Sequence, residues 1–172
     1  MRIERVWAMP NKWTFQIKPI AKLLKEEMND GTWIDPFCGE SSLAQITNDI
    51  NPRIKAQDHV DAFEFLENCK YINADGVLFD PPYSVRQVAE CYKQFGYKVD
   101  NKTTQANWYS DRKDAVARVI KPNGKAICFG WNSNGLGKNR GFGLERILLV
   151  PHGGPHNDTI VTVERKINTS LF

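Results

Sequence analysis

The chain has 172 residues, of which 41% are hydrophobic and 25% are charged, and its net charge is +3. The length suits one domain with a sizeable core, and the longest apolar stretch is far shorter than the roughly 20 residues that span a bilayer, which excludes a membrane-embedded protein. The mild positive charge permits nucleic-acid binding without requiring it. The N-terminus carries an acid and has no apolar signal region, so we expect a cytoplasmic protein.

Hydrophobic periodicity predicts helices and strands that alternate along most of the chain. In chain order, the expected elements are a helix at 16–28, strands at 32–34, 45–49 and 54–57, a helix at 62–69, a strand at 76–79, helices at 84–95 and 108–120, and strands at 125–129, 144–150 and 159–166. The stretches 96–107 and 130–143 are predicted loops. This order is typical of an α/β fold, with a mainly parallel sheet and an antiparallel C-terminal hairpin, and we expect a single domain over 1–172.

Local signals refine some of these elements. Asp61 and Ser84 precede two of the helices and are predicted N-caps. Phe63 and Leu66 are expected on the inner side of the helix at 62–69, with Phe65 as a further candidate. Little chain separates the first two strands, so we expect their crossover to be compressed.

Cysteines and histidines give no indication of a metal site. The four cysteines, at positions 38, 69, 91 and 128, form no close pair, so we expect neither a disulfide framework nor a zinc site. We assign His152 and His156, which flank a Gly-Gly-Pro turn, to turn structure. No cysteine follows a proline, which sets aside the cytosine C5 methyltransferases.

The apolar strand at 76–79 leads directly into Asp80-Pro81-Pro82-Tyr83. Asp80 can accept a hydrogen bond from an exocyclic amine, and the Pro81 carbonyl can accept a second from the same nitrogen. The prolines contribute no N–H donor, and Tyr83 can stack on a flat ring, so the segment suits a planar substrate that carries an amine.

Asp-Pro-Pro-Tyr resembles the catalytic motif of the amino-methyltransferases, above all the small, phage-type DNA N6-adenine methyltransferases. The resemblance implies a Rossmann-like class I fold, S-adenosylmethionine as methyl donor, and DNA as partner in a bacterial or phage-infected cell. It implies direct transfer to the N6 amine of a flipped-out adenine. We expect no separate target-recognition domain, and a chain this small can grip DNA as a homodimer.

Four acids lie at or just after predicted strand ends, namely Asp35, Asp49, Asp61 and Asp80. Ligands of such sheets bind at the carboxyl ends of the strands, so these acids suit a nucleoside-binding crevice. By family resemblance, Asp35 contacts the methionine end of the donor, Asp49 the ribose, and Asp61 with Ala62 the adenine.

Two further stretches resemble donor-site motifs of the same family. The loop that resembles motif I reads Asp35-Pro36-Phe37-Cys38-Gly39, but Glu40 follows where a second glycine is usual. The stretch that resembles motif X reads Phe15-Gln16-Ile17-Lys18-Pro19, and it makes Phe15 and Lys18 further candidates for contact with the methionine end.

The loop at 130–143 combines an aromatic residue, amides, glycines and cations. Trp131, Asn132, Lys138 and Arg140 are candidate contacts to a nucleic-acid strand, with the two cations on phosphate. A flexible surface connection explains the same glycines equally well. The neighbours Arg112 and Lys113 are further phosphate candidates, and a solvated charged surface is the alternative for both.

Other acceptors remain open at this stage. Similar motifs occur in RNA amino-methyltransferases, which act on adenine N6 or guanine N2, and in cytosine N4 enzymes, which usually carry Ser at the acid position. Protein glutamine methyltransferases carry Asn instead of Asp80. A catalytically silent subunit that binds S-adenosylmethionine is the alternative from another class, and the intact Asp-Pro-Pro-Tyr segment argues against it.

Overall fold

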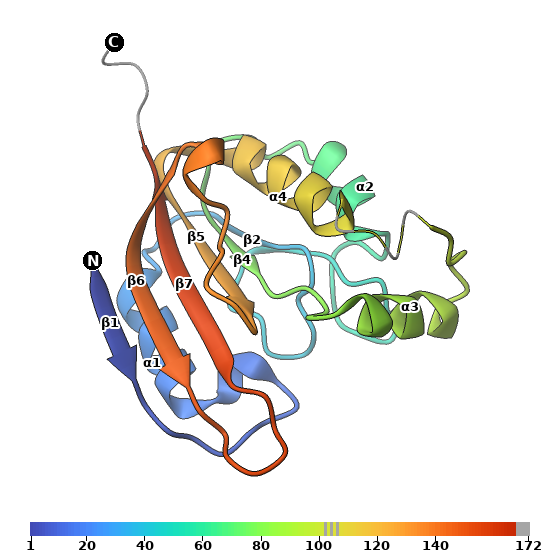
Figure 1. The fold of residues 1–172 in the computed structure, drawn as a ribbon. Helices are drawn as coiled ribbons and strands as arrows, with labels where there is room; N and C mark the ends of the chain where they lie inside the picture. The colour runs from blue at the N-terminus through green and yellow to red at the C-terminus, as the bar shows by residue number, and fades with distance from the viewer. Residues whose placement is uncertain (102, 104, 106, 168–172) are drawn as a thin grey trace.

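A computed structural model describes residues 1–101, 103, 105 and 107–167, and Figure 1 shows one mixed sheet between helices. The strands are β1 (Arg2–Arg5), β2 (Trp33–Asp35), β3 (Ile46–Thr47), β4 (Ala74–Phe79), β5 (Ile120–Gly130), β6 (Phe142–Val150) and β7 (Thr159–Lys166). The helices are α1 (Lys18–Glu27), α2 (Ala62–Glu67), α3 (Val85–Gln94) and α4 (Asn107–Val119), with short 3-10 turns η1 (Thr14–Gln16) and η2 (Lys138–Arg140). No helix in the described part of the chain has the length and apolar composition that a membrane crossing requires.

The seven-stranded sheet has the order β1-β6-β7-β5-β4-β2-β3. β7 runs antiparallel to its neighbours β5 and β6, and the other pairs are parallel. The predicted mainly parallel sheet with an antiparallel C-terminal hairpin is therefore confirmed.

The two faces of the sheet carry separate apolar cores, because successive side chains of a strand point to opposite faces. Leu78 of β4 packs in the core that α1 covers, whereas Val77 and Phe79 pack in the core that α2 and α4 cover. The strand that leads into Asp80 is thus buried on both faces, which holds its carboxyl end in place.

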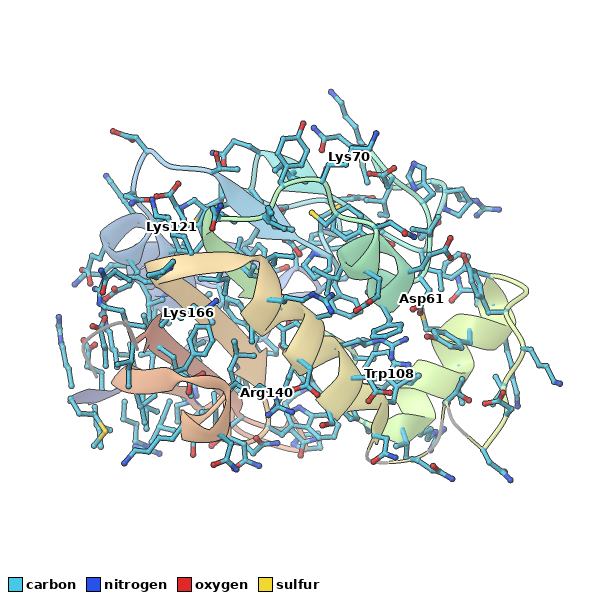
Figure 2. All side chains as sticks on the ribbon, turned by 90° about the horizontal axis from the view of Figure 1, so that it is seen from above. Asp61, Lys70, Trp108, Lys121, Arg140 and Lys166 are labelled. Atoms are coloured by element: carbon cyan, nitrogen blue, oxygen red, sulfur yellow. The ribbon has the colours of Figure 1, made fainter. Side chains whose placement is uncertain are left out.

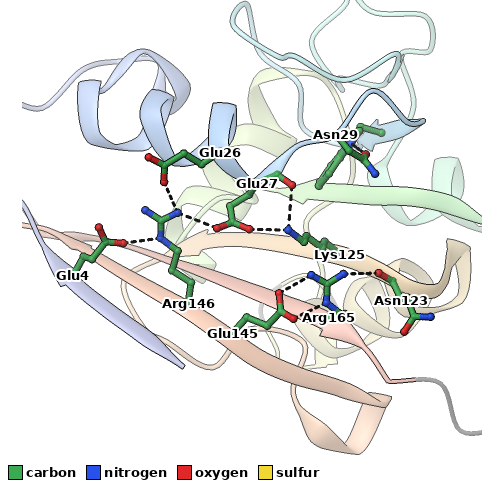
Figure 3. A network of polar contacts seen from close by, with 10 residues as sticks. Glu4, Glu26, Glu27, Asn29, Asn123, Lys125, Glu145, Arg146 and Arg165 are labelled. Carbon is green, nitrogen blue, oxygen red and sulfur yellow. Dashed lines mark hydrogen bonds and ion pairs between the residues drawn. The ribbon is translucent and has the colours of Figure 1, made fainter.

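Strand β1 was not predicted. Three of its four residues are charged and only Ile3 is apolar, and it pairs in parallel with β6, more than 140 positions away. Figure 3 shows what holds it: Arg146 of β6 contacts Glu4 of β1 at 2.6 Å and two acids of α1, Glu26 at 2.7 Å and Glu27 at 2.9 Å. This pairing depends on long-range contacts that a local pattern does not reveal.

Other local expectations are corrected. The prediction of a strand at 54–57 is wrong, because the chain turns at these residues. The neighbouring Asp58 forms only an isolated bridge with Asn48. Phe63 is 36% exposed, whereas Phe65 and Leu66 are buried. β5 begins directly after α4 at Ile120, rather than after a separate turn.

The compressed first crossover and both predicted caps are confirmed. All residues at 36–45 are described and none is helical. Asp61 accepts a hydrogen bond from the Phe63 N–H, and Ser84 accepts one from the Gln87 N–H. The carboxyl ends of β2, β3 and β4 consequently open onto loops rather than onto packed helices.

Candidate active site

A cavity of about 410 Å³ lies where these loops meet. Its walls come from the segment around η1, the loop after β2, the turn after β3, the Asp80–Tyr83 segment and α3. The lining residues are Lys12, Trp13, Thr14, Phe15, Phe37, Cys38, Gly39, Ser41, Asp49, Ile50, Asp80, Pro81, Pro82, Tyr83, Gln87 and Cys91. All four predicted catalytic residues are therefore in the wall of one cavity.

The Asp80 carboxyl is held by a hydroxyl group. The Tyr83 hydroxyl donates to Asp80 Oδ1 at 2.5 Å, and Thr14 lines the same cavity. Burial raises the pKa of Asp80 to about 6, although hydrogen bonding acts in the opposite direction. Asp80 is consequently a hydrogen-bond acceptor above that pH and is neutral below it.

The backbone of the same segment is held on two sides. Tyr109 of α4 donates its hydroxyl to the Pro82 carbonyl at 2.8 Å, and the Tyr83 N–H donates to Gln87 Oε1 of α3 at 2.7 Å. Within the described residues, the Pro81 carbonyl accepts no hydrogen bond. It is one acceptor of this segment that is left for a ligand.

The loop after β2 folds around a buried acid. Asp35 accepts hydrogen bonds from the Phe37 N–H at 3.0 Å and from the Ser42 hydroxyl at 2.6 Å. Burial raises the pKa of Asp35 to about 7, with smaller contributions from the charges of Asp80 and Asp49. Asp35 thus shapes the loop from inside and is not among the residues that line the cavity.

Gly39 links this loop to the acid after β3. Its N–H donates to Asp49 Oδ2 at 2.9 Å, and its φ of +52° lies in the left-handed region that favours glycine. A Cβ at this position would lie 3.1 Å from the Trp13 ring. Glycine therefore lets the loop approach Trp13, while Asp49 faces the cavity.

The donor-site candidates divide into two groups. Phe15, Phe37, Cys38, Gly39 and Asp49 line the cavity, as expected. The others do not line it, namely Lys18, Asp35, Pro36, Asp61 and Ala62. Lys18 is exposed in the first turn of α1, and Pro36 is buried.

Asp61 is engaged elsewhere, so the geometry does not support its assignment to the donor's adenine. Arg112 Nη2 donates to both of its carboxylate oxygens, at 2.8 and 2.9 Å, and the Tyr92 hydroxyl also donates to it. Arg112 is buried and lies over the Trp108 ring, 3.8 Å from its centre. Ala62 is buried in α2. The expected phosphate contact of Arg112 is likewise corrected, because its charge is neutralised inside the protein.

The loop between β5 and β6 approaches the site through Trp131. Its ring packs edge-on against Tyr83, with 5.8 Å between the ring centres, and it is 41% exposed. Asn132 accepts a hydrogen bond from the Asn134 N–H, and Lys138 is exposed in η2. Trp131 is thus placed to contact whatever Tyr83 contacts.

Arg140 does not project to solvent as expected. It pairs with Asp114 of α4 at 2.6 Å and donates to the Ser110 hydroxyl at 2.9 Å and to the Leu136 carbonyl at 3.0 Å. Its assignment to phosphate is corrected, because it ties this loop to α4 (Figure 2).

Glu164 of β7 anchors the same loop from beneath and was missed in the sequence. Its buried carboxylate accepts the N–H of Leu136 at 2.5 Å and the N–H of Gly137 at 3.0 Å. Gly135 has a φ of +48°, and a Cβ there would lie 2.2 Å from this carboxylate. The available signal was an acid directly after Val163, at the end of the apolar part of the strand. Thr14, Gln87 and Tyr109 were also missed, and they carried no signal of their own.

His152 has a structural role. Its ring nitrogens lie 2.9 Å from the Ala8 carbonyl and 2.9 Å from the Thr159 hydroxyl, which joins the segment after β1 to the β6–β7 loop. His156 is exposed, and no group of three potential metal ligands occurs among the described residues.

No family model matches the chain, and no curated protein matches it by sequence. Solved structures match its fold. TrmN from Thermus thermophilus aligns with a TM-score of 0.57 and 17% identity over 88% of this chain and 49% of that chain, so the present chain spans about half its length. This is a Rossmann-like methyltransferase fold.

Two smaller methyltransferases align over most of their own length. A 1,6-didemethyltoxoflavin-N1-methyltransferase from Burkholderia thailandensis has a TM-score of 0.55 and 11% identity, over 86% of this chain and 76% of that chain. The N-methyltransferase NodS from Bradyrhizobium japonicum has a TM-score of 0.54 and 9% identity, over 88% of this chain and 96% of that chain. At these identities, the methyltransferase fold is what the proteins share.

Proposed function

We propose that this protein transfers the methyl group of S-adenosylmethionine to the N6 amine of adenine in DNA. The observation that carries the proposal is that Asp80 and Pro81 lie in the wall of one cavity at the carboxyl end of β4, with the Pro81 carbonyl open. An acceptor pair of this kind suits an amine on a flat ring.

The residues of the large cavity fit the proposed donor. Asp49 offers carboxylate oxygens for ribose hydroxyls, and Phe15, Phe37 and Ile50 offer apolar surface. The Burkholderia thailandensis neighbour was crystallised with S-adenosylhomocysteine, which agrees with a donor of this type. Bound there, S-adenosylmethionine supplies an electrophilic methyl group.

The chain's own residues position and polarise the amine. The nitrogen lone pair of an adenine amine is delocalised into the ring, and hydrogen bonds from its two N–H groups to Asp80 and to the Pro81 carbonyl favour a more pyramidal, more nucleophilic nitrogen. Tyr83 holds the ring of the extruded base by stacking. As the new N–C bond forms, the C–S bond of the donor breaks, and the nitrogen gives up one proton to the Asp80 carboxylate or to solvent. The rate gain comes from positioning and electrostatics, without a covalent enzyme intermediate.

Labelled methyl transfer onto unmodified DNA, RNA and protein, followed by nucleoside analysis, tests this proposal. We expect N6-methyladenine in DNA, loss of the product with Asp80→Ala, and unchanged product with Glu145→Gln, a surface variant on β6. Label in RNA, or in another base, would show that the acceptor differs from the one proposed, while the reaction would still be methyl transfer. No transfer to any polymer would refute the proposal.

A further inference from the structure

A second cavity lies against the same catalytic segment. It has a volume of about 60 Å³ and shares Pro81, Pro82 and Tyr83 with the large cavity. Its other walls include Tyr109 and Lys113 of α4 and Trp131 of the β5–β6 loop. The catalytic segment therefore lines two cavities, and five of the residues that line the smaller one are aromatic: Phe79, Tyr83, Tyr109, Phe129 and Trp131.

Lys113 is the cation of this second cavity. It is half-buried, and within the described residues it forms neither an ion pair nor a hydrogen bond. Among the described residues, the other partly buried lysines have partners: Lys166 donates to the Ala117 and Ile120 carbonyls, Lys125 pairs with Glu27, and Lys121 pairs with Asp75. A desolvated donor without a partner costs free energy, so a ligand that supplies an acceptor gains from it.

The charged groups near Lys113 do not provide an ion-pair or hydrogen-bond partner for its amine. Three titratable groups act on it: Cys128, whose pKa burial raises to about 12, and Arg140 and Glu164, which carry opposite charges. Glu164 is already occupied by two backbone N–H groups, and Arg140 by Asp114 and Ser110. Burial lowers the pKa of Lys113, yet its amine keeps N–H donors in either protonation state.

The second cavity offers both an acceptor and a donor. Tyr109 occupies the Pro82 carbonyl, the Pro81 carbonyl is an open acceptor, and Lys113 supplies a donor, whereas Asp80 lines only the adjoining large cavity. A nucleobase with an exocyclic amine matches this arrangement, because such a ring also carries unprotonated nitrogens that accept hydrogen bonds.

We infer that the second cavity receives the aminated base and that Lys113 is its specificity-determining donor, which hydrogen-bonds to a ring nitrogen. This rests on the proposed function and adds to it a residue that recognises the ring rather than the amine. A cavity of about 60 Å³ holds on the order of two waters at ~30 Å³ each, so the exposed Trp131 must move away from Tyr83 to admit a base.

The test compares methyl transfer onto oligonucleotides that carry adenine, 1-deazaadenine, 3-deazaadenine or 7-deazaadenine at the target position. We expect the wild type to lose about 10- to 100-fold in kcat/KM on one of these analogues, since a hydrogen bond to a charged group is lost. For Lys113→Met, kcat/KM on adenine should fall by a similar factor relative to the wild type. On that analogue, the kcat/KM of Lys113→Met should equal that of the wild type. Lys22→Met, at an exposed lysine of α1, is the matched control.

Each outcome separates the two proposals. A wild type that methylates all three analogues as well as adenine overturns the role of Lys113, and this result does not require that any variant folds. A Lys113→Met variant that loses equally on every substrate also overturns it and indicates a contact to phosphate. A wild type that transfers no methyl group to adenine refutes the proposed function, and the Lys113 inference falls with it.

Discussion

The Tyr83 hydroxyl donates a hydrogen bond of 2.5 Å to Oδ1 of Asp80. The aromatic ring that we assign to the substrate and the acid that we assign to its amine are thus joined before a substrate binds. The hydroxyl occupies only Oδ1, so Oδ2 is the carboxylate oxygen that we assign to the amine.

This hydrogen bond has a consequence for the pH dependence of activity. The reaction needs the Asp80 carboxylate, whose pKa is raised to about 6, so activity should fall as the pH falls through that value. Tyr83→Phe removes a hydrogen bond that favours the carboxylate, and the acid limb of kcat/KM should therefore move to higher pH. Tyr71→Phe, at an exposed tyrosine, should leave the limb in place. A limb that stays or moves lower in Tyr83→Phe would contradict this role.

Substitution of Asp49 should weaken binding of the methyl donor, whereas substitution of Asp61 should lower the stability of the fold. Asp49 faces the cavity and holds Gly39, so Asp49→Ala should weaken S-adenosylmethionine binding by about tenfold or more, roughly 1.4 kcal/mol. Asp61→Ala leaves Arg112 buried and unpaired, which should cost about 3–5 kcal/mol of unfolding free energy.

Calorimetry and urea denaturation distinguish these effects. Affinity of folded Asp61→Ala within a few-fold of wild type is the expected result. A loss of affinity with Asp61→Ala, together with none for Asp49→Ala, would restore Asp61 to the donor site and remove Asp49 from it.

The Glu164 anchor should matter for the loop that carries Trp131. Glu164→Gln places an amide in contact with the Leu136 and Gly137 N–H groups, and a donor facing a donor should cost about 1–3 kcal/mol of unfolding free energy. Glu145→Gln is the matched control, because its ion pair with Arg165 is about 40% exposed and is worth about 1 kcal/mol or less. Equal stability of the two variants in urea would show that the anchor is dispensable.

Asp35 should make the protein less stable as the pH rises. Its pKa is about 7 in the folded protein against 3.8 as its ordinary value, so the folded state binds the proton more tightly. The favourable contribution is complete below pH 3.8 and is lost as the pH rises through 7, by at most about 1.4 kcal/mol per pH unit. Asp35→Asn should flatten the decline of unfolding free energy between pH 4.5 and 7. A decline that is as steep in Asp35→Asn would assign it to Asp80 or to other groups.

Much of the fold follows from local patterns. Leu78 lies between Val77 and Phe79 in an apolar run that only a strand buried on both faces explains, and Asp61 and Ser84 are caps because their side chains accept nearby N–H groups. β1 is different: it is a strand because it pairs with β6 and because Glu4 forms an ion pair with Arg146. Both partners are remote in the sequence.

The candidate site divides in the same way. The sequence by itself determined that an acid, two prolines and a tyrosine follow a buried strand, and that acids follow other strands, because strand ends and turn residues are local properties. Only the tertiary structure decided which acids are free: Asp49 faces the cavity, whereas Asp61 is neutralised by Arg112, 51 positions away. It also brought Tyr109, Lys113 and Glu164 to the catalytic segment and its loop, because partners for buried polar groups are chosen in space rather than along the chain.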